Sequence, residues 1–160
     1  MAFTASKIFR RFLFDALNRT VAFDLDADVP KVALYGNTGT PNQDETTSVL
    51  TAYNGAASQW VTANEVIDSS GGGTDWPSGG KVLVSGTTDA GTAATVFYDA
   101  ADTVSGATAD ITAAYGCLVY DDTVAGKPGI CYNYFGGSNS VVAGTFTIVW
   151  NASGLFRFTL

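Results

Sequence analysis

The stretch that decides the fold is DITAAYGCLVYDDTVAGKPGICYNYF, residues 110–135. Two apolar runs, rich in Ile, Val, Tyr and Cys, flank a polar segment that contains Asp, Gly and Pro. β-Branched and aromatic residues suit strands, whereas Gly, Pro and Asp favour turns. The pattern therefore predicts two antiparallel strands joined by a hairpin connection, DDTVAGKPG, at residues 121–129.

The same stretch carries the two cysteines of the chain, Cys117 and Cys131. If the strands pair about a turn centred on Val124, the two thiols lie directly opposite each other, near disulfide distance. The other interpretation is a pair of small, reduced, half-buried residues, which is the norm for a cytoplasmic product. We favour free thiols and keep a disulfide as the alternative.

Other strand-like runs surround this hairpin, namely KVALYG, KVLVS, TVFYDA, GTFTIVW and LFRFT. NASG, residues 151–154, predicts a tight turn between the last two runs. The stretch VAFDLDADV, residues 21–29, alternates apolar and polar side chains and is predicted as a half-buried strand. The predicted fold class is mainly β. It is a single antiparallel β-sandwich, jelly-roll-like, over residues 21–160, with a long Gly-rich loop around residues 68–80.

Residues 1–20 are predicted as an N-terminal amphipathic helix, because apolar side chains recur at helical spacing over residues 4–18. This segment has a net charge of +3, whereas the rest of the chain carries −10. The helix either folds back over an open edge of the sandwich or docks into a neighbouring subunit or a capsid. The candidate interface residues are Lys7, Phe9, Arg10, Arg11, Phe12, Leu13, Leu17 and, in the Gly-rich loop, Trp76.

Composition argues against several classes of function. The 160 residues suit one domain, and the net charge of −7 disfavours binding to nucleic acid. No apolar stretch is long enough for a membrane span, and arginines interrupt the apolar part of the N-terminus, so we expect no secretion signal. The chain has no His, which removes the commonest general base and a common zinc ligand. We therefore expect no enzymatic activity, no cofactor and no membrane partner.

Acidic residues supply the remaining candidate chemistry. Asp24, Asp26 and Asp28 have the alternate spacing of a hard-cation site, but the Gly and Glu of an EF-hand loop are missing. A strand with one face in water explains them, so no metal site is predicted. Four other acids could supply the carboxylate pair of a glycoside hydrolase, but they fall where turns are expected: Asp99, Asp102, Asp121 and Asp122.

Three segments carry a resemblance to a family: VPKVALYG after an acidic stretch, GCLVYDD, and GTFTIVWNASG at residues 144–154. Together they resemble small β-rich virion proteins of tailed bacteriophages, which are called capsid decoration, cement or minor capsid proteins. The resemblance covers most of the chain except residues 38–80, and it implies no catalytic residues.

The resemblance implies a non-enzymatic protein on the outside of a phage head, made in the host bacterial cytoplasm. The implied partners are the major capsid protein and copies of the chain itself, and a trimer would match the three-fold positions of a capsid lattice. The alternative is a tail-associated or receptor-binding virion protein that recognises host glycans through Trp76 and loop tyrosines.

Overall fold

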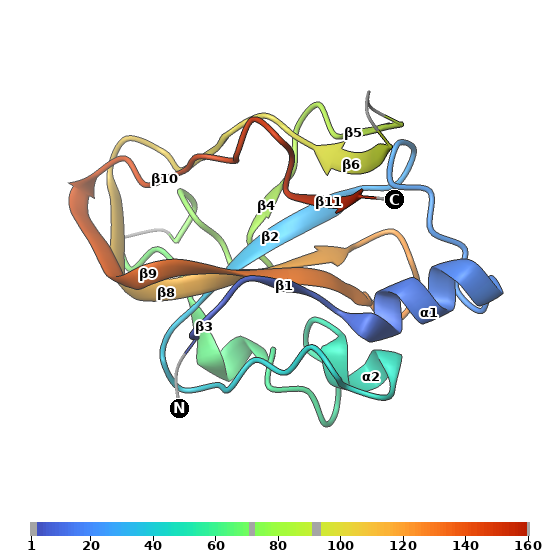
Figure 1. Ribbon diagram of the computed structural model, residues 1–160. Helices are drawn as coiled ribbons and strands as arrows, with labels where there is room; N and C mark the ends of the chain where they lie inside the picture. Colours follow the sequence, from blue (N-terminus) through green and yellow to red (C-terminus); the bar gives the residue numbers. More distant parts are fainter. Residues whose placement is uncertain (1–2, 71–72, 91–93, 160) are drawn as a thin grey trace.

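The computed structural model describes residues 3–70, 73–90 and 94–159, and all structural statements concern these residues (Figure 1). Strands hold 38% of the structure and helices 11%, which confirms the mainly-β prediction. All strand pairs are antiparallel. The helices are α1 (Arg10–Asn18), α2 (Ser48–Thr51) and a short 3-10 turn, η1 (Thr62–Asn64).

A central sheet organises the molecule. Its strands follow the order β1-β9-β8-β2-β3, and β4 also pairs with β2. The long strands β8 and β9 form the hairpin that the sequence predicts, with Asp121 donating its N–H to the Pro128 carbonyl at the turn (3.0 Å). The strands of this sheet are β1 (Lys7–Ile8), β2 (Pro30–Tyr35), β3 (Glu65–Val66), β4 (Lys81–Val82), β8 (Ala109–Asp121) and β9 (Gly129–Gly144).

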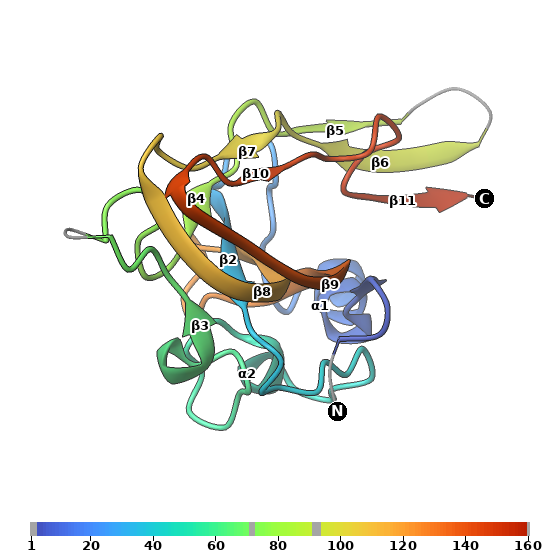
Figure 2. The ribbon, with the colours of Figure 1, turned by 90° about the vertical axis from the view of Figure 1, so that its left-hand side faces the viewer.

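Two smaller sheets lie on one side of the central sheet, and α2 lies on the other (Figure 2). One has the order β11-β6-β5, and the other pairs β10 with β7. The predicted NASG turn is confirmed, because Gly154 donates its N–H to the Asn151 carbonyl (2.8 Å). The jelly-roll-like strand order stays a prediction. The strands are β5 (Thr87–Asp89), β6 (Thr95–Asp99), β7 (Thr103–Val104), β10 (Thr147–Ile148) and β11 (Phe156–Thr159).

An aromatic cluster fills the core between the central sheet and the N-terminal segment. Trp60 is 1% exposed and contacts four other rings, with centroids 5.0–6.0 Å apart. Most of these contacts are edge-to-face, which is a favourable geometry for aromatic pairs. The rings around Trp60 belong to Phe3, Phe9, Tyr35 and Tyr132.

The N-terminal helix is shorter than predicted. It begins at Arg10, whereas Lys7 and Ile8 form β1 and pair with Tyr132 and Cys131 of β9. Phe9 then donates its N–H to the Ile130 carbonyl (3.0 Å). The helical prediction over residues 4–9 is therefore wrong, because the backbone there bonds to a neighbouring strand.

The predicted strand at residues 21–29 is also wrong. The carbonyl of Asp24 accepts hydrogen bonds from the N–H groups of Ala27 (2.9 Å) and Asp28 (2.7 Å), and Asp28 Oδ2 accepts one from the Asp24 N–H (2.8 Å). Short acidic side chains can bond to nearby backbone and compete with a strand ladder. The segment is thus a turn that the side chains of Asp24 and Asp28 hold together.

Candidate functional site

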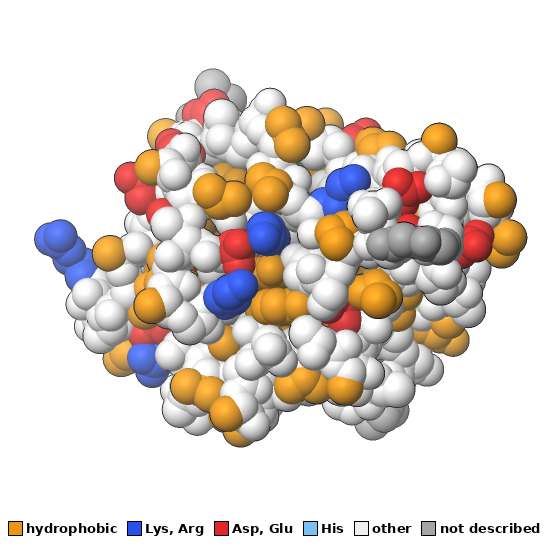
Figure 3. Space-filling view, turned by 180° about the vertical axis from the view of Figure 1, so that it is seen from behind, with side chains coloured by type: hydrophobic (Ala, Val, Ile, Leu, Met, Phe, Trp, Pro, Cys, Tyr) orange, Lys and Arg blue, Asp and Glu red, His pale blue; other side chains and the backbone are white. Residues whose placement is uncertain are grey.

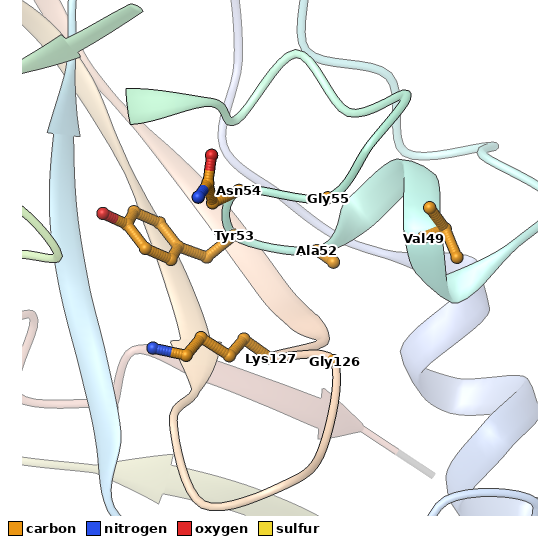
Figure 4. A pocket seen from close by; sticks show the side chains of 7 residues that line it. All are labelled: Val49, Ala52, Tyr53, Asn54, Gly55, Gly126 and Lys127. Atoms are coloured by element: carbon orange, nitrogen blue, oxygen red, sulfur yellow. The ribbon is translucent and has the colours of Figure 1, made fainter. Parts of the chain in front are cut away.

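A cavity of about 420 Å³ opens beside α2 (Figure 4). Tyr53 and Lys127 approach it from different segments of the chain, and the Lys127 Nζ lies 5.7 Å from the centre of the Tyr53 ring. Tyr53 also stacks on Tyr120 of β8, with ring centroids 4.5 Å apart. The wall of the cavity that Tyr53 forms therefore packs on the central sheet. Its lining residues are Val49, Ala52, Tyr53, Asn54, Gly55, Gly126 and Lys127.

Glu65 of β3 accepts a hydrogen bond from the hydroxyl of Tyr53. Its Oε2 accepts hydrogen bonds from the hydroxyls of Tyr53 (3.1 Å) and Ser78 (2.9 Å), and its Oε1 accepts one from the Gly79 N–H (2.8 Å). Burial raises the pKa of the Glu65 carboxyl, although these three donors act in the opposite direction. Both oxygens already have donors, so Glu65 positions Tyr53 and the loop that contains Ser78 and Gly79.

Lys127 forms an ion pair with Asp122. The Asp122 carboxylate lies 2.7 Å from the Nζ atoms of both Lys127 and Lys31. Burial favours a higher pKa for Asp122, but the hydrogen bonds from the two lysines lower it below its ordinary value. The polar groups at this cavity thus satisfy one another. Such an arrangement can bind a ligand in the cavity.

The outer side of α1 is a second candidate site. Phe14 is 52% exposed and Leu17 is 85% exposed, next to the guanidinium of Arg11, which lies 4.8 Å from the Phe14 ring centre. Arg10 is also largely exposed and pairs with Asp44 (2.9 Å). We call Arg10, Arg11, Phe14 and Leu17 the α1 face. It combines two large apolar side chains with two cations.

Asp15 fixes the orientation of this helix. Its carboxylate is 1% exposed and accepts hydrogen bonds from Arg11 Nε (2.8 Å) and from the Thr20 hydroxyl (2.5 Å). On the same inner side, Phe12 packs edge-to-face on Phe23 with ring centroids 4.8 Å apart. The α1 face is therefore presented by a helix that is anchored to the body of the protein.

The structure divides the predicted interface residues into two groups. Phe9 is 0% exposed, Phe12 is 6% exposed and Leu13 packs against the core, so the fold-back interpretation describes these three. Phe9 and Phe12 are not free to contact a partner, which corrects their assignment as interface residues, whereas Leu13 is only partly buried. Lys7 lies exposed on β1, and Leu17 is exposed on α1.

The prediction that Trp76 lies on the surface of the Gly-rich loop is wrong. Its side chain is 0% exposed and packs edge-to-face on Phe146, with ring centroids 5.9 Å apart. The loop folds inward here because the Trp76 carbonyl accepts a hydrogen bond from the Asp68 N–H (2.9 Å). The proposed glycan-stacking residue therefore lies inside the core.

Asp68 is a key residue that sequence reasoning missed. Its Oδ1 accepts hydrogen bonds from the N–H groups of Ser70 and Asp110 (both 2.9 Å), and its Oδ2 accepts them from the Ser70 hydroxyl (2.7 Å) and the Asp75 N–H (3.3 Å). The Asp110 N–H, followed by the other donors, lowers the pKa of Asp68 to about 2. An Asp before Ser-Ser and three glycines is a signal for a local side-chain turn, but the bond to β8 is not visible in the sequence.

The two cysteines do not face each other. Cys117 pairs with Asn133 and Cys131 pairs with Val119, so the hairpin is centred on Ala125 rather than Val124. A shift of one residue in the centre moves each partner by two positions, which places the thiols diagonally. Both thiols are free and buried, and burial raises the pKa of Cys117 to about 12.

The remaining acidic candidates already accept hydrogen bonds. Asp99 Oδ1 accepts the N–H of its neighbour Ala100 (2.9 Å), as expected for a residue at a turn, whereas Asp102 Oδ1 accepts the N–H of Trp150 (3.0 Å), 48 residues further along the chain. Asp122 is bound by its two lysines, and Asp121 Oδ1 accepts the N–H groups of Thr123 (2.9 Å) and Val124 (3.3 Å). Within the described ranges, no three or more Asp, Glu, Cys or His side chains are grouped as a metal site. No helix there has the length and apolar character needed to cross a membrane.

We compared the chain with family models, with curated proteins and with solved structures, and none of them matches it.

Proposed function

We propose that the chain is a non-enzymatic structural protein of a tailed-phage virion, most simply a decoration protein that binds the outside of the head and stabilises it. The observation that carries this proposal is the α1 face, where Phe14 and Leu17 are exposed on a helix whose inner side is anchored in the core. The resemblance of the VPKVALYG, GCLVYDD and GTFTIVWNASG segments supports the same class of protein.

One face of the surface also supports assembly. Seen from behind, apolar side chains are spread among uncharged atoms and lie in a hollow near the centre, beside a group of charged side chains (Figure 3). The N-terminal segment is basic, whereas the rest of the chain is strongly acidic. A partner with an apolar socket would bind Phe14 and Leu17, and repulsion between an acidic partner surface and the acidic body would disfavour other orientations of the protein on the shell.

The small size of this contact indicates that each copy binds the shell weakly and that many copies bind together. Burying Phe14 and Leu17 completely would contribute roughly 3–5 kcal/mol before the cost of association. One such contact gives low affinity by itself. Repetition of the contact over a lattice, with copies that also touch one another, would raise the effective affinity by two or more orders of magnitude.

We expect the double variant Phe14→Ser/Leu17→Ser to lose at least tenfold in affinity for phage heads that have been stripped of the protein, because its apolar anchors are gone. Co-sedimentation with the heads measures this affinity. The two side chains are exposed, so the Tm should change by no more than about 2 °C.

The matched control is Val142→Ser/Val149→Ser, which removes two apolar side chains that are 80% and 72% exposed and belong to neither α1 nor α2. This variant should bind like the unmodified chain. Unchanged binding of the Phe14/Leu17 variant, or an equal loss in the control, would overturn the role of the α1 face.

A further inference from the structure

The edge strand β1 has backbone groups that no other described strand binds. Lys7 and Ile8 pair with β9, and Phe9 continues the ladder by donating its N–H to the Ile130 carbonyl (3.0 Å). Along an antiparallel strand, residues that bond to the partner strand alternate with residues whose N–H and C=O point away from it. Because Phe9 bonds to β9, the N–H and C=O of Ile8 point away from β9, and no hydrogen bond joins them to another described residue.

The C-terminal strand β11 is also an edge strand. Among the described strands it pairs with β6 alone, in the sheet order β11-β6-β5, and Figure 1 shows it above β1. Phe156 of β11 has a fixed position, because its ring stacks on Tyr98 (centroids 5.8 Å apart) and packs edge-to-face on Phe12 of α1 (5.9 Å). Packing in the core therefore holds β11 in place beside the N-terminal segment.

A cavity of about 310 Å³ lies between these two edge strands. Ile8, Leu155 and Phe156 supply an apolar part of its lining. A second cavity, of about 350 Å³, shares Leu155, Phe156 and Arg157 with the first, so the hollow continues along β11. We call the two cavities together the β1–β11 groove. It is larger than a single carboxylate or phosphate group requires.

The β1–β11 groove is positively charged in an acidic protein. Lys7 and Arg157 line it, both are exposed, and neither forms an ion pair with another described residue. None of the residues that line the two cavities is Asp or Glu. The chain as a whole has a net charge of −7, so two unpaired cations at one groove differ from their surroundings. Such a groove attracts a negatively charged partner that the rest of the surface repels.

We propose that the β1–β11 groove binds an extended, acidic peptide segment of a partner protein, which adds a short strand to β1. The backbone of the segment bonds to the N–H and C=O of Ile8, its apolar side chains contact Leu155 and Phe156, and its carboxylates pair with Lys7 and Arg157. A free anion would use the two cations alone and leave the strand edge and the apolar lining uncovered. The groove contains none of the residues of the α1 face, so this contact is independent of the proposed function.

Fluorescence anisotropy with a labelled, end-capped peptide of alternating Val and Glu tests this proposal. We expect saturable binding below about 1 mM, and about a tenfold loss of affinity in Lys7→Gln/Arg157→Gln, because both charge pairs are gone. Lys7 and Arg157 are exposed, so this variant should keep its Tm within about 2 °C. The matched control, Arg19→Gln/Lys81→Gln, removes the same charge outside the groove and should bind the peptide within about twofold of the unmodified chain.

Two further measurements use only the unmodified chain and so do not depend on how the variants fold. A peptide with Gln in place of Glu should bind about tenfold more weakly, because it lacks the carboxylates. The acidic peptide should slow amide hydrogen exchange at Ile8 by about fivefold or more and leave exchange at Val82, in the edge strand β4, unchanged. The proposal is overturned if the acidic peptide does not bind, if the Gln peptide binds equally well, if exchange at Ile8 is unaffected, or if Lys7→Gln/Arg157→Gln binds no more weakly than the control.

Discussion

Replacing Phe9 with alanine is expected to lower the free energy of unfolding by about 4 kcal/mol. The Phe9 ring is 0% exposed and lies 5.3 Å from the Tyr132 ring and 6.0 Å from the Trp60 ring, measured between centroids. The ring also packs against Gly129, where an added Cβ would lie 2.9 Å from it. Truncation therefore opens a cavity in a tightly packed region that joins the N-terminal segment to β9, and the large cost follows from poor relaxation around that cavity.

Urea unfolding at equilibrium measures this loss, and Phe14→Ala is the matched control. Phe14 has the same side chain and lies five residues further along, but it is 52% exposed, so its truncation should cost less than about 1 kcal/mol. Similar losses in the two variants would show that the N-terminal segment is not anchored as the structure describes.

The second large effect is expected for Asp68→Ala, which should lower the free energy of unfolding by roughly 3 kcal/mol at pH 7. The substitution removes the acceptor for three backbone N–H groups and one hydroxyl, and it releases the Gly-rich loop from β8 at Asp110. The control Asp44→Ala breaks only the exposed ion pair with Arg10 and should cost less than about 1 kcal/mol.

The effect of Asp68→Ala should also depend on pH. The pKa of Asp68 is about 2 in the folded chain and close to its ordinary value of 3.8 when unfolded, so folding favours the ionised form. Its contribution is present above about pH 4 and is lost as the pH falls towards 2. The difference in stability between the unmodified chain and Asp68→Ala should therefore narrow over that range. A difference that stays constant from pH 5 to pH 2 would contradict the role of the ionised carboxylate.

Local patterns were sufficient to predict part of this architecture. The hairpin formed by β8 and β9, the strand at residues 30–35 and the turn at residues 151–154 each have apolar runs and turn residues that agree with their surroundings. In such segments, local preference and tertiary packing favour the same structure, so a sequence pattern is a reliable guide.

The errors arose where distant contacts decide the structure. Residues 7–9 bond to β9 instead of extending α1, and Trp76 is buried because Asp68 bonds to the loop around it and to a strand 42 residues away. The alternating aspartates at 24–28 imitate the period of a strand, but Asp24 and Asp28 bond to the backbone of their own turn, and Asp26 accepts the N–H of Thr88, 62 residues away. The exposure of Phe14 and Leu17 could not be predicted, because a stripe of apolar residues does not show which of its members the body covers.

A cryo-EM map of the complete particle, with the chain fitted into its density, tests most directly the proposal that the chain is a structural component of a phage head. We expect many copies on the outer surface of the shell, with the α1 face against the major capsid protein. A few copies confined to the tail would favour the receptor-binding alternative. A particle that contains no copy of the chain would contradict the account.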